Sequence, residues 1–264
     1  MKAQFLRIIL LSAGAWSILQ VGHEIIGHGF MVIMVGGEVL SVDGMYLNHN
    51  LEDVSDLGLR WVKAGGSLFN IVWAIGAFLL LRSRTFKNYT TNYFLWVSVA
   101  LNLMQSGSYI GFGRYISKGM DWSMILEGIQ NRMLWEFMET FGGLLLLTFG
   151  VWVAVRYGKW FMGWGTISSS KILYWVPLFT STVLSVVSSV LIPTTDRFMM
   201  LMGGIGNGFT FLFPLFVLGF FSTKKEMKSP SFVDTKNLVL QLFLMGMVVF
   251  YLLVMSPGIE FNGR

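Results

Sequence analysis

The chain has no cysteine and little charge. Its 264 residues contain no Cys, and Asp, Glu, Lys and Arg together make up 12% of them, about half of the share in an average soluble domain. Disulfides and thiolate ligands are thus excluded, so a metal ion would have to be bound by histidine, carboxylate or carbonyl groups. The net charge of +5 lies in segments that flank apolar stretches, which indicates membrane topology and argues against nucleic-acid binding.

Long apolar stretches predict an all-α polytopic membrane protein that is embedded in the lipid bilayer. Hydrophobic residues make up 54% of the chain, its mean hydropathy is +0.64, and several stretches reach the ~20 residues that are needed to cross a bilayer. Residues 1–130 would form a membrane core, and the helices of residues 131–264 would pack on it. We expect about seven transmembrane helices, over residues 4–35, 58–81, 93–109, 133–155, 172–191, 198–221 and 238–255.

Basic and acidic connections alternate between these helices. Lys and Arg concentrate at the N-terminus and after the second, fourth and sixth helices, whereas the other connections are acidic or nearly neutral. Because cytoplasmic loops carry the excess of Lys and Arg, this pattern predicts that the N-terminus lies in the cytoplasm. The acidic connection after the first helix begins, at residues 38–47, with alternating apolar and polar residues, which predict a short β-hairpin.

The first apolar stretch contains an unusual polar motif at residues 22–29, with the sequence GHEIIGHG. It holds His23, Glu24 and His28, and ionisable groups at membrane depth are costly and usually mark a functional site. The nearest template is H-E-x-x-H, in which two histidines bind zinc and the glutamate is the general base. Here the spacing is one residue longer, H-E-x-x-x-H.

The longer spacing predicts a distorted helix. Residues five apart on a regular α-helix lie about 140° apart, so His23 and His28 could not reach one metal ion. A π-type bulge would bring them towards one face, and the glycines on either side reduce its steric cost. The soluble dipeptidyl peptidase III family has a similar H-E-L-L-G-H zinc helix, which implies that this spacing can bind metal. The alternative is a buried histidine pair that hydrogen-bonds to neighbouring helices.

Two more polar residues are expected at the depth of this motif. Asn70 lies about a dozen residues into the second predicted helix, which enters from the side near His28, and Asp121 follows the third helix on the same side. A catalytic zinc site usually has three protein ligands, so a carboxylate is expected beside the two histidines. Asp43 and Asp53 on the hairpin connection are the alternatives to Asp121.

The remaining polar residues are assigned structural roles. His49 is interpreted as a solvated loop histidine because it lies between two asparagines. Arg132, Glu136 and Glu139 are interpreted as a surface ion-pair group on one helix face. The third helix is expected to break at residues 111–114, which contain two glycines, and the sixth to bend at Pro214.

Taken in order, these features resemble the site-2 protease group of intramembrane zinc metallopeptidases. The resemblance covers about residues 15–130. It rests on the histidine-glutamate helix, the hairpin-like segment after Gly36 and Gly37, the stretch Ala64, Gly65 and Asn70, and Asp121 beside a broken helix. The chain departs from the family in the longer motif, in Gly66 where the family has proline, and in a Met-Asp-Trp context for Asp121. The family generally cuts on the cytosolic side, whereas the charge pattern puts this site nearer the outside.

The resemblance implies a set of roles for these residues. His23, His28 and Asp121 would bind Zn²⁺, Glu24 would activate water, and Asn70 would hold the substrate strand or the oxyanion. The reaction would be the hydrolysis of a peptide bond in a membrane-associated protein or peptide substrate. Two alternatives stay open from the residues alone: a non-proteolytic protein that handles metal ions or protons, and a catalytically inactive scaffold.

Overall fold

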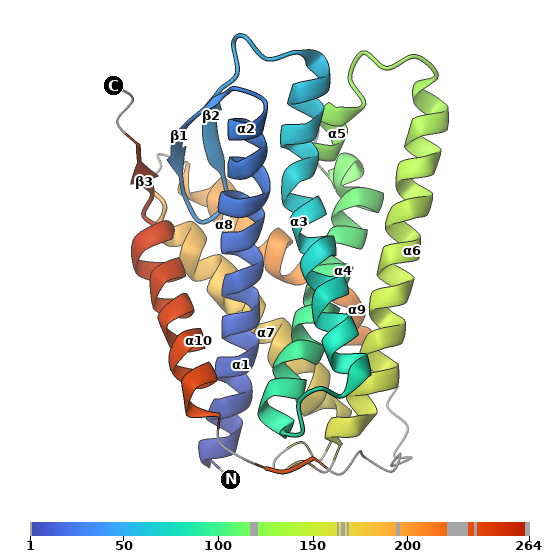
Figure 1. The fold of residues 1–264 in the computed structure, drawn as a ribbon, viewed down its shortest axis with the longest axis vertical. Coiled ribbons are helices and arrows are strands. Elements are labelled where there is room, and N and C mark those ends of the chain that lie inside the picture. The colour runs from blue at the N-terminus through green and yellow to red at the C-terminus, as the bar shows by residue number, and fades with distance from the viewer. Residues whose placement is uncertain are drawn as a thin grey trace.

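The computed structural model describes residues 2–116, 121–162, 164, 167, 169–193, 196–220, 232–234 and 237–261. Its helices form an upright bundle, with a small sheet at the upper end (Figure 1). The helical elements are α1 (Lys2–Val21), the π-helix η1 (Gly22–Gly29), α2 (Phe30–Met34), α3 (Asp56–Ser83), α4 (Tyr89–Ile116), α5 (Asp121–Ile125), α6 (Arg132–Gly158), the 3-10 helix η2 (Lys159–Phe161), α7 (Ser170–Leu191), α8 (Arg197–Ile205), the π-helix η3 (Gly206–Thr210), α9 (Phe213–Phe220), α10 (Leu238–Phe250) and the π-helix η4 (Tyr251–Met255).

Helices occur at all seven predicted positions. Five of them are long and apolar enough to cross a membrane, and there are six if the segments 197–210 and 213–220, which meet at 46°, count as one bent span. The chain therefore has the helices of an integral membrane protein. α4 is also long, but many of its buried residues are Asn, Gln, Ser and Thr, so it is less apolar than the others. The number of membrane crossings stays a prediction.

α4 runs through the region where the sequence predicted a break. The expected break at residues 111–114 is wrong, because the helix continues to Ile116. Gly107 and Gly111 of this helix instead face Gly143 of α6, where an added Cβ would lie 2.5 Å from Gly111 Cα and 2.7 Å from the Gly107 carbonyl oxygen. Small residues at such a crossing let two helix backbones touch. The glycines therefore serve helix packing.

Two ion pairs near the start of α6 differ in their surroundings. Arg132 Nε lies 2.8 Å from Glu136 Oε1, and both side chains are partly exposed, as predicted. The assignment of Glu139 to the same surface group is wrong. Glu139 is 7% exposed and lies 2.6 Å from the guanidinium of Arg114 on α4, because its position on α6 faces that helix.

The sheet contains three short antiparallel strands in the order β2–β1–β3: β1 (Glu38–Val42), β2 (Leu47–Asn50) and β3 (Ile259–Glu260). The predicted hairpin is therefore confirmed, and a strand from the far end of the chain extends it. His49 is half-buried in β2 and pairs with Val39. It does not lie in a loop, which corrects the interpretation from the sequence.

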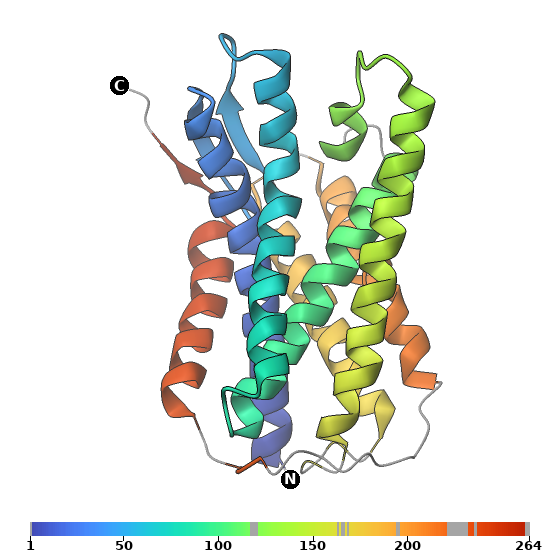
Figure 2. The ribbon, with the colours of Figure 1, turned by 45° about the vertical axis from the view of Figure 1, so that its right-hand side comes forward.

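The later helices pack directly on the earlier ones. α7 and α10 lie along α1, and α6 lies along α4. α1 begins at the lower end of the bundle, whereas β3 lies at the upper end beside the hairpin (Figure 2). Nothing in this packing divides the chain at residue 130, so the two proposed regions stay a prediction.

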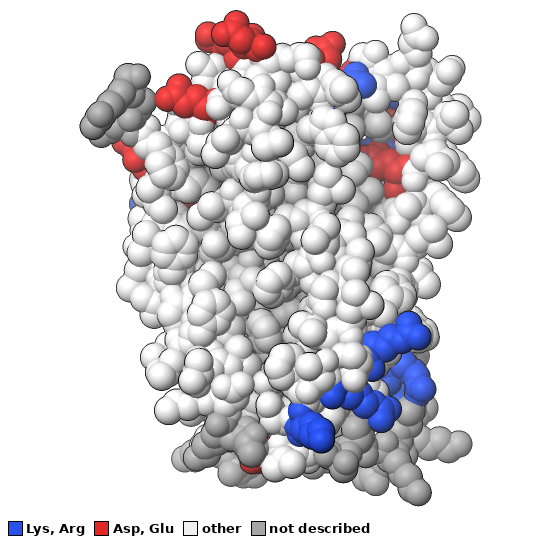
Figure 3. All heavy atoms as spheres, in the orientation of Figure 1, with Lys and Arg blue, Asp and Glu red and all other residues white. Residues whose placement is uncertain are grey.

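Charged side chains separate between the two ends of the bundle. On the face in view, the acidic ones gather at the upper end, around the hairpin and the start of α3, and the basic ones near the lower end (Figure 3). Between the two ends the surface carries few charges, as expected for helices that contact hydrocarbon. The bundle is thus polarised along its long axis.

Candidate metal centre

The distorted helix predicted from the histidine spacing is present. Residues Gly22–Gly29 form a π-helix that continues from α1 into α2 without a break, since the residues at both of its ends keep helical backbone angles. A π-helix bonds each residue to the one five positions on. His23 and His28 therefore come to one side, with ring centroids 4.9 Å apart.

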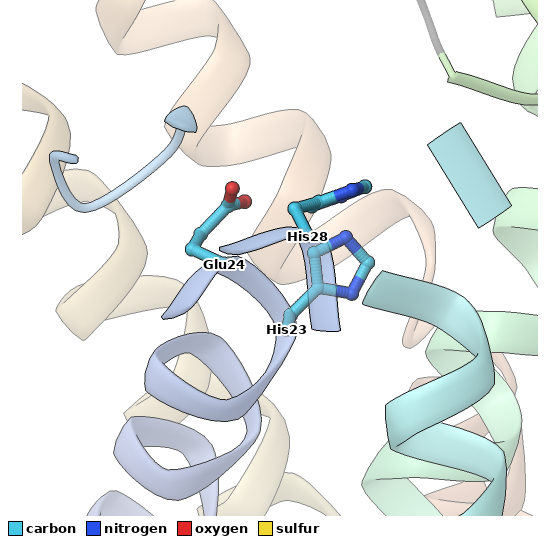
Figure 4. Close-up of side chains that lie close together, drawn as sticks. All are labelled: His23, Glu24 and His28. Carbon is cyan, nitrogen blue, oxygen red and sulfur yellow. The ribbon is translucent and has the colours of Figure 1, made fainter. Parts of the chain in front are cut away.

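His23, Glu24 and His28 form one buried group. Each offers a ligand atom, and these atoms all lie within 4.8 Å of one another. The side chains project from the same helix (Figure 4), and the residues are 8%, 6% and 6% exposed. Two imidazoles and a carboxylate at these separations could hold a metal ion, and they match the ligand types that zinc accepts.

Glycines on two elements let α3 approach this π-helix closely. A Cβ added to Gly27 would lie 2.6 Å from Gly66 Cα, and one added to Gly65 would lie 2.9 Å from the carbonyl carbon of Gly27. A Cβ on Gly66 would meet the imidazole of His23, 2.6 Å from Cε1. The His23 ring thus takes up the space that a side chain on Gly66 would fill.

One face of α3 supplies the partners of the two histidines. The helix begins after Ser55, whose hydroxyl accepts a hydrogen bond from the backbone of Gly58. Val62, Gly66 and Asn70 follow at intervals of four, so they lie on one side of the helix. These three positions all contact the group on η1. Helical periodicity alone therefore brings them to the site.

His28 is oriented by α3 and approached by α5. Its Nδ1 lies 2.7 Å from the carbonyl oxygen of Val62, which can only accept, so Nδ1 carries a proton and an ion could bind only at Nε2, after that nitrogen has given up any proton of its own. Nε2 lies 3.4 Å from Asp121 Oδ2. Asp121 also accepts a hydrogen bond from the Tyr109 hydroxyl at 3.0 Å and pairs with Lys63 at 3.4 Å.

Asp121, the predicted third ligand, thus lies next to one histidine. It does not belong to the group whose ligand atoms are all within 4.8 Å of one another. Burial disfavours its charged form, but the hydrogen bond to His28 and the charges of His28 and Lys63 outweigh that effect and hold the pKa of Asp121 at about 2. The carboxylate is therefore ionised beside the nitrogen that would bind an ion.

The two alternative carboxylates lie apart from the group. Asp43 accepts hydrogen bonds from the backbone nitrogens of Met45 and Tyr46, at 2.7 and 2.8 Å, and so shapes the hairpin turn. Burial raises the pKa of Asp43. Asp53 is exposed. Neither is part of the metal-binding group among the described residues.

Asn70 contacts His23 and begins a chain of amides. Its Nδ2 lies 3.0 Å from His23 Nδ1 and 3.4 Å from Gln105 Oε1 on α4. The Gln105 Nε2 donates in turn to Asn207 Oδ1 on η3, at 2.9 Å. Asn70 was predicted as a site residue from the sequence, whereas Gln105 and Asn207 were not. The signal that pointed to Asn70, an amide within an apolar helix, is also present at Gln105.

Lys63 and Tyr109 were missed for a different reason. Both contact Asp121, but neither residue type stands out within its own helix, and only the docking of α5 brings them together. Trp122 of α5 secures that docking by donating a hydrogen bond to Ser67 at 3.0 Å.

Compared with known proteins, the chain matches no family model, no curated protein and no solved structure.

Proposed function

We propose that this protein is an intramembrane zinc metallopeptidase that hydrolyses a peptide bond of a membrane-associated protein substrate. One observation carries the proposal: the π-helix gathers His23, Glu24 and His28 into a single buried group with ligand-atom separations within 4.8 Å. A regular helix would point the two histidines about 140° apart. The distortion therefore has a clear use if both bind one ion.

The residues of the chain would divide the chemistry as follows. His23 and His28 hold the ion, with Val62 and Asn70 orienting the two rings. Glu24, next to His23 in the sequence, takes a proton from the attacking water. When bound, zinc would lower the pKa of that water and polarise the scissile carbonyl.

Asp121 is proposed as the third ligand. It is ionised and touches His28 Nε2, so a small shift of α5 would bring it to an ion held by the two histidines. Asn70 is engaged with His23 and Gln105. These contacts support a role in positioning His23, and contact of Asn70 with a substrate or oxyanion stays a prediction.

A second candidate function rests on Glu24. Its carboxylate, and not that of Asp121, belongs to the group with mutually close ligand atoms. If Glu24 is the third ligand, it cannot also serve as the base, and the site would bind metal without hydrolysing peptides. Such a protein would handle metal ions as a carrier or a sensor. The two functions predict different results for Glu24→Gln: a peptidase would keep zinc and lose hydrolysis, whereas a metal-handling protein would lose zinc.

We propose that the N-terminus lies in the cytoplasm and that the metal centre opens towards the opposite side. The acidic end of the bundle, with the hairpin, lies at the end towards which η1 and α2 run (Figures 1 and 3). Basic side chains near the other end match a cytoplasmic surface. A substrate would then reach the site from the hairpin end, within the lipid bilayer or at its outer surface.

The test compares metal content and hydrolysis in detergent-purified protein. We expect about one zinc per wild-type chain and none in His23→Ala or His28→Ala, whereas His49→Ala, a matched histidine outside the group, should keep it. Glu24→Gln should keep zinc but lose cleavage of a dye-quenched, unfolded casein. Asp121→Asn should bind zinc more weakly.

Each contrary outcome has a distinct meaning. Loss of zinc in Glu24→Gln, together with no casein cleavage by the wild type, would favour the metal-handling function. Absence of zinc in a folded wild type after incubation with Zn²⁺ would reject the metal centre and leave an inactive scaffold. Zinc binding that is unchanged in Asp121→Asn would exclude this carboxylate as a ligand.

A further inference from the structure

A chain of three amides, two of them buried and the third, Asn207, half-buried, connects the metal centre to the far side of the bundle. Asn70 on α3, Gln105 on α4 and Asn207 on η3 follow one another through hydrogen bonds of 3.4 and 2.9 Å. Asn70 and Gln105 are 1% and 6% exposed. The NH₂ group of each of the first two donates away from the metal centre, to the oxygen of the next. The chain therefore has a direction.

This direction determines which nitrogen of His23 carries a proton. The NH₂ group of Asn70 can only donate, so His23 Nδ1, at 3.0 Å, must accept. In a neutral imidazole the proton then lies on Nε2, and a protonated nitrogen cannot bind a metal ion. Because Asn70 occupies Nδ1, Nε2 is the nitrogen that remains for an ion. To bind a metal ion through Nε2, His23 must carry its proton on Nδ1, and the group that contacts Nδ1 must then be a hydrogen-bond acceptor.

The acceptor must be the Asn70 oxygen, so its amide has to reverse. Its oxygen would then face Gln105 Oε1, and two acceptors at this separation repel each other. Gln105 must consequently reverse as well and present its NH₂ group, and Asn207 must donate where it now accepts. Both directions allow Asn70 two hydrogen bonds at this end, because its NH₂ group has two hydrogens and its oxygen two lone pairs. In the direction seen here the Asn70 oxygen Oδ1 is buried and has no hydrogen-bond partner among the described residues.

We propose that Asn70, Gln105 and Asn207 act as one reversible chain of positioning residues whose direction decides whether His23 can bind the metal ion. This inference rests on the metal-binding part of the proposed function. Gln105 and Asn207 touch neither His23 nor the other members of the group among the described contacts. They act through Asn70. Asn207 lies in η3, which ends just before the 46° bend between residues 210 and 213, so metal binding is linked to that segment.

Carboxylate substitutions test the direction, since a carboxylate has the size of an amide and only accepts. Asn70→Asp presents an acceptor to His23 and should bind zinc about tenfold more tightly. Asn207→Asp holds the chain in the direction seen here and should bind zinc about tenfold more weakly. Gln105→Glu holds the Asn70 NH₂ group and should act like Asn207→Asp. The readout is the zinc Kd, measured by competition with a chromophoric chelator at about pH 8, where carboxylates are ionised.

The signs separate this inference from simpler explanations. An added negative charge would strengthen zinc binding in all three variants, whereas a general loss of packing would weaken it in all three. In a Gln105→Leu background the chain is interrupted, so Asn207→Asp should no longer change the Kd. Thermal unfolding of the metal-free proteins checks that each variant folds.

Two failures can be told apart. A wild type that binds no zinc overturns the proposed metal centre, and this inference with it. Normal zinc binding by the wild type, with the Kd of Asn207→Asp equal to or lower than that of the wild type, overturns the chain alone. An effect of Asn207→Asp that persists in the Gln105→Leu background would also overturn it.

Discussion

Replacing Gly66 by alanine should weaken metal binding strongly and lower the stability of the protein moderately. The added Cβ would lie 2.5 Å from Cδ2 and 2.6 Å from Cε1 of the His23 ring. Carbon atoms in contact normally lie ~3.5–4.0 Å apart, so the ring has to move by about 1 Å. The backbones of α3 and η1 are already in close contact at Gly65 and Gly27, so we expect the ring to move and not the helix.

A shift of this size exceeds what a metal site tolerates. Ligands must be held within about 0.5 Å of their working geometry, so we expect the zinc Kd of Gly66→Ala to rise at least about 100-fold. Overpacking should lower the free energy of unfolding by about 1–3 kcal/mol. Both quantities can be measured on the same detergent-purified protein, by chelator competition and by thermal unfolding.

Gly76 provides a matched control on the same helix. An added Cβ at that position meets nothing within 4 Å, so Gly76→Ala should keep the wild-type zinc Kd. It should also stabilise the helix by about 0.5–1 kcal/mol, because alanine loses less backbone entropy than glycine. If Gly66→Ala bound zinc as tightly as Gly76→Ala, the His23 ring could not be packed against α3 in the metal-binding state.

Three further predictions concern topology, ion pairs and metal. The chain has no cysteine, and Asp53 and Arg84 lie beyond opposite ends of α3. A membrane-impermeant maleimide should therefore label Asp53→Cys in intact cells and Arg84→Cys only after lysis, whereas the reverse would invert the proposed topology. Arg114→Met leaves the buried carboxylate of Glu139 unpaired and should lower the free energy of unfolding by about 3–5 kcal/mol. Arg132→Met breaks a partly exposed pair and should change it by less than about 1 kcal/mol; equal losses in chemical denaturation would contradict the difference in burial. Removing zinc with a chelator should lower the Tm of the wild type but not of His23→Ala, and a wild-type Tm that ignores the chelator would contradict zinc binding to the folded state.

Regular helices and the distortion at the metal centre could be predicted from the sequence. Apolar length gave all seven helix positions, since hydrophobic runs of this length have few other structures open to them. The spacing of His23 and His28 predicted the π-helix, because one metal ion requires both side chains on one side. The alternating residues after Gly37 predicted the hairpin. Each of these inferences needed only neighbouring residues.

The contacts between distant segments could not be predicted in the same way. An amide inside an apolar helix indicates that a partner exists but does not say which, so Asn70 could not be connected to Gln105 or Asn207. Glu139 gave the same difficulty, because its partner Arg114 is on another helix. Glycines at a helix crossing, such as Gly111, have the same sequence signal as glycines at a break.

The irregular helical segments explain where prediction from periodicity fails. Three π-helical segments occur among the described residues, and each carries a contact between segments distant in the sequence or, at η1, the clustered ionisable group. η1 gathers His23, Glu24 and His28 into the group that could hold a metal ion, η3 presents Asn207 to the amide chain, and η4 begins with Tyr251, whose hydroxyl donates to the carbonyl oxygen of Gly44 in the hairpin turn. Only at η1 could the π-helix be predicted from the sequence, because His23 and His28 are two residues that one metal ion would need on the same side. At η3 and η4 a single polar residue carries the contact, so no spacing could disclose it.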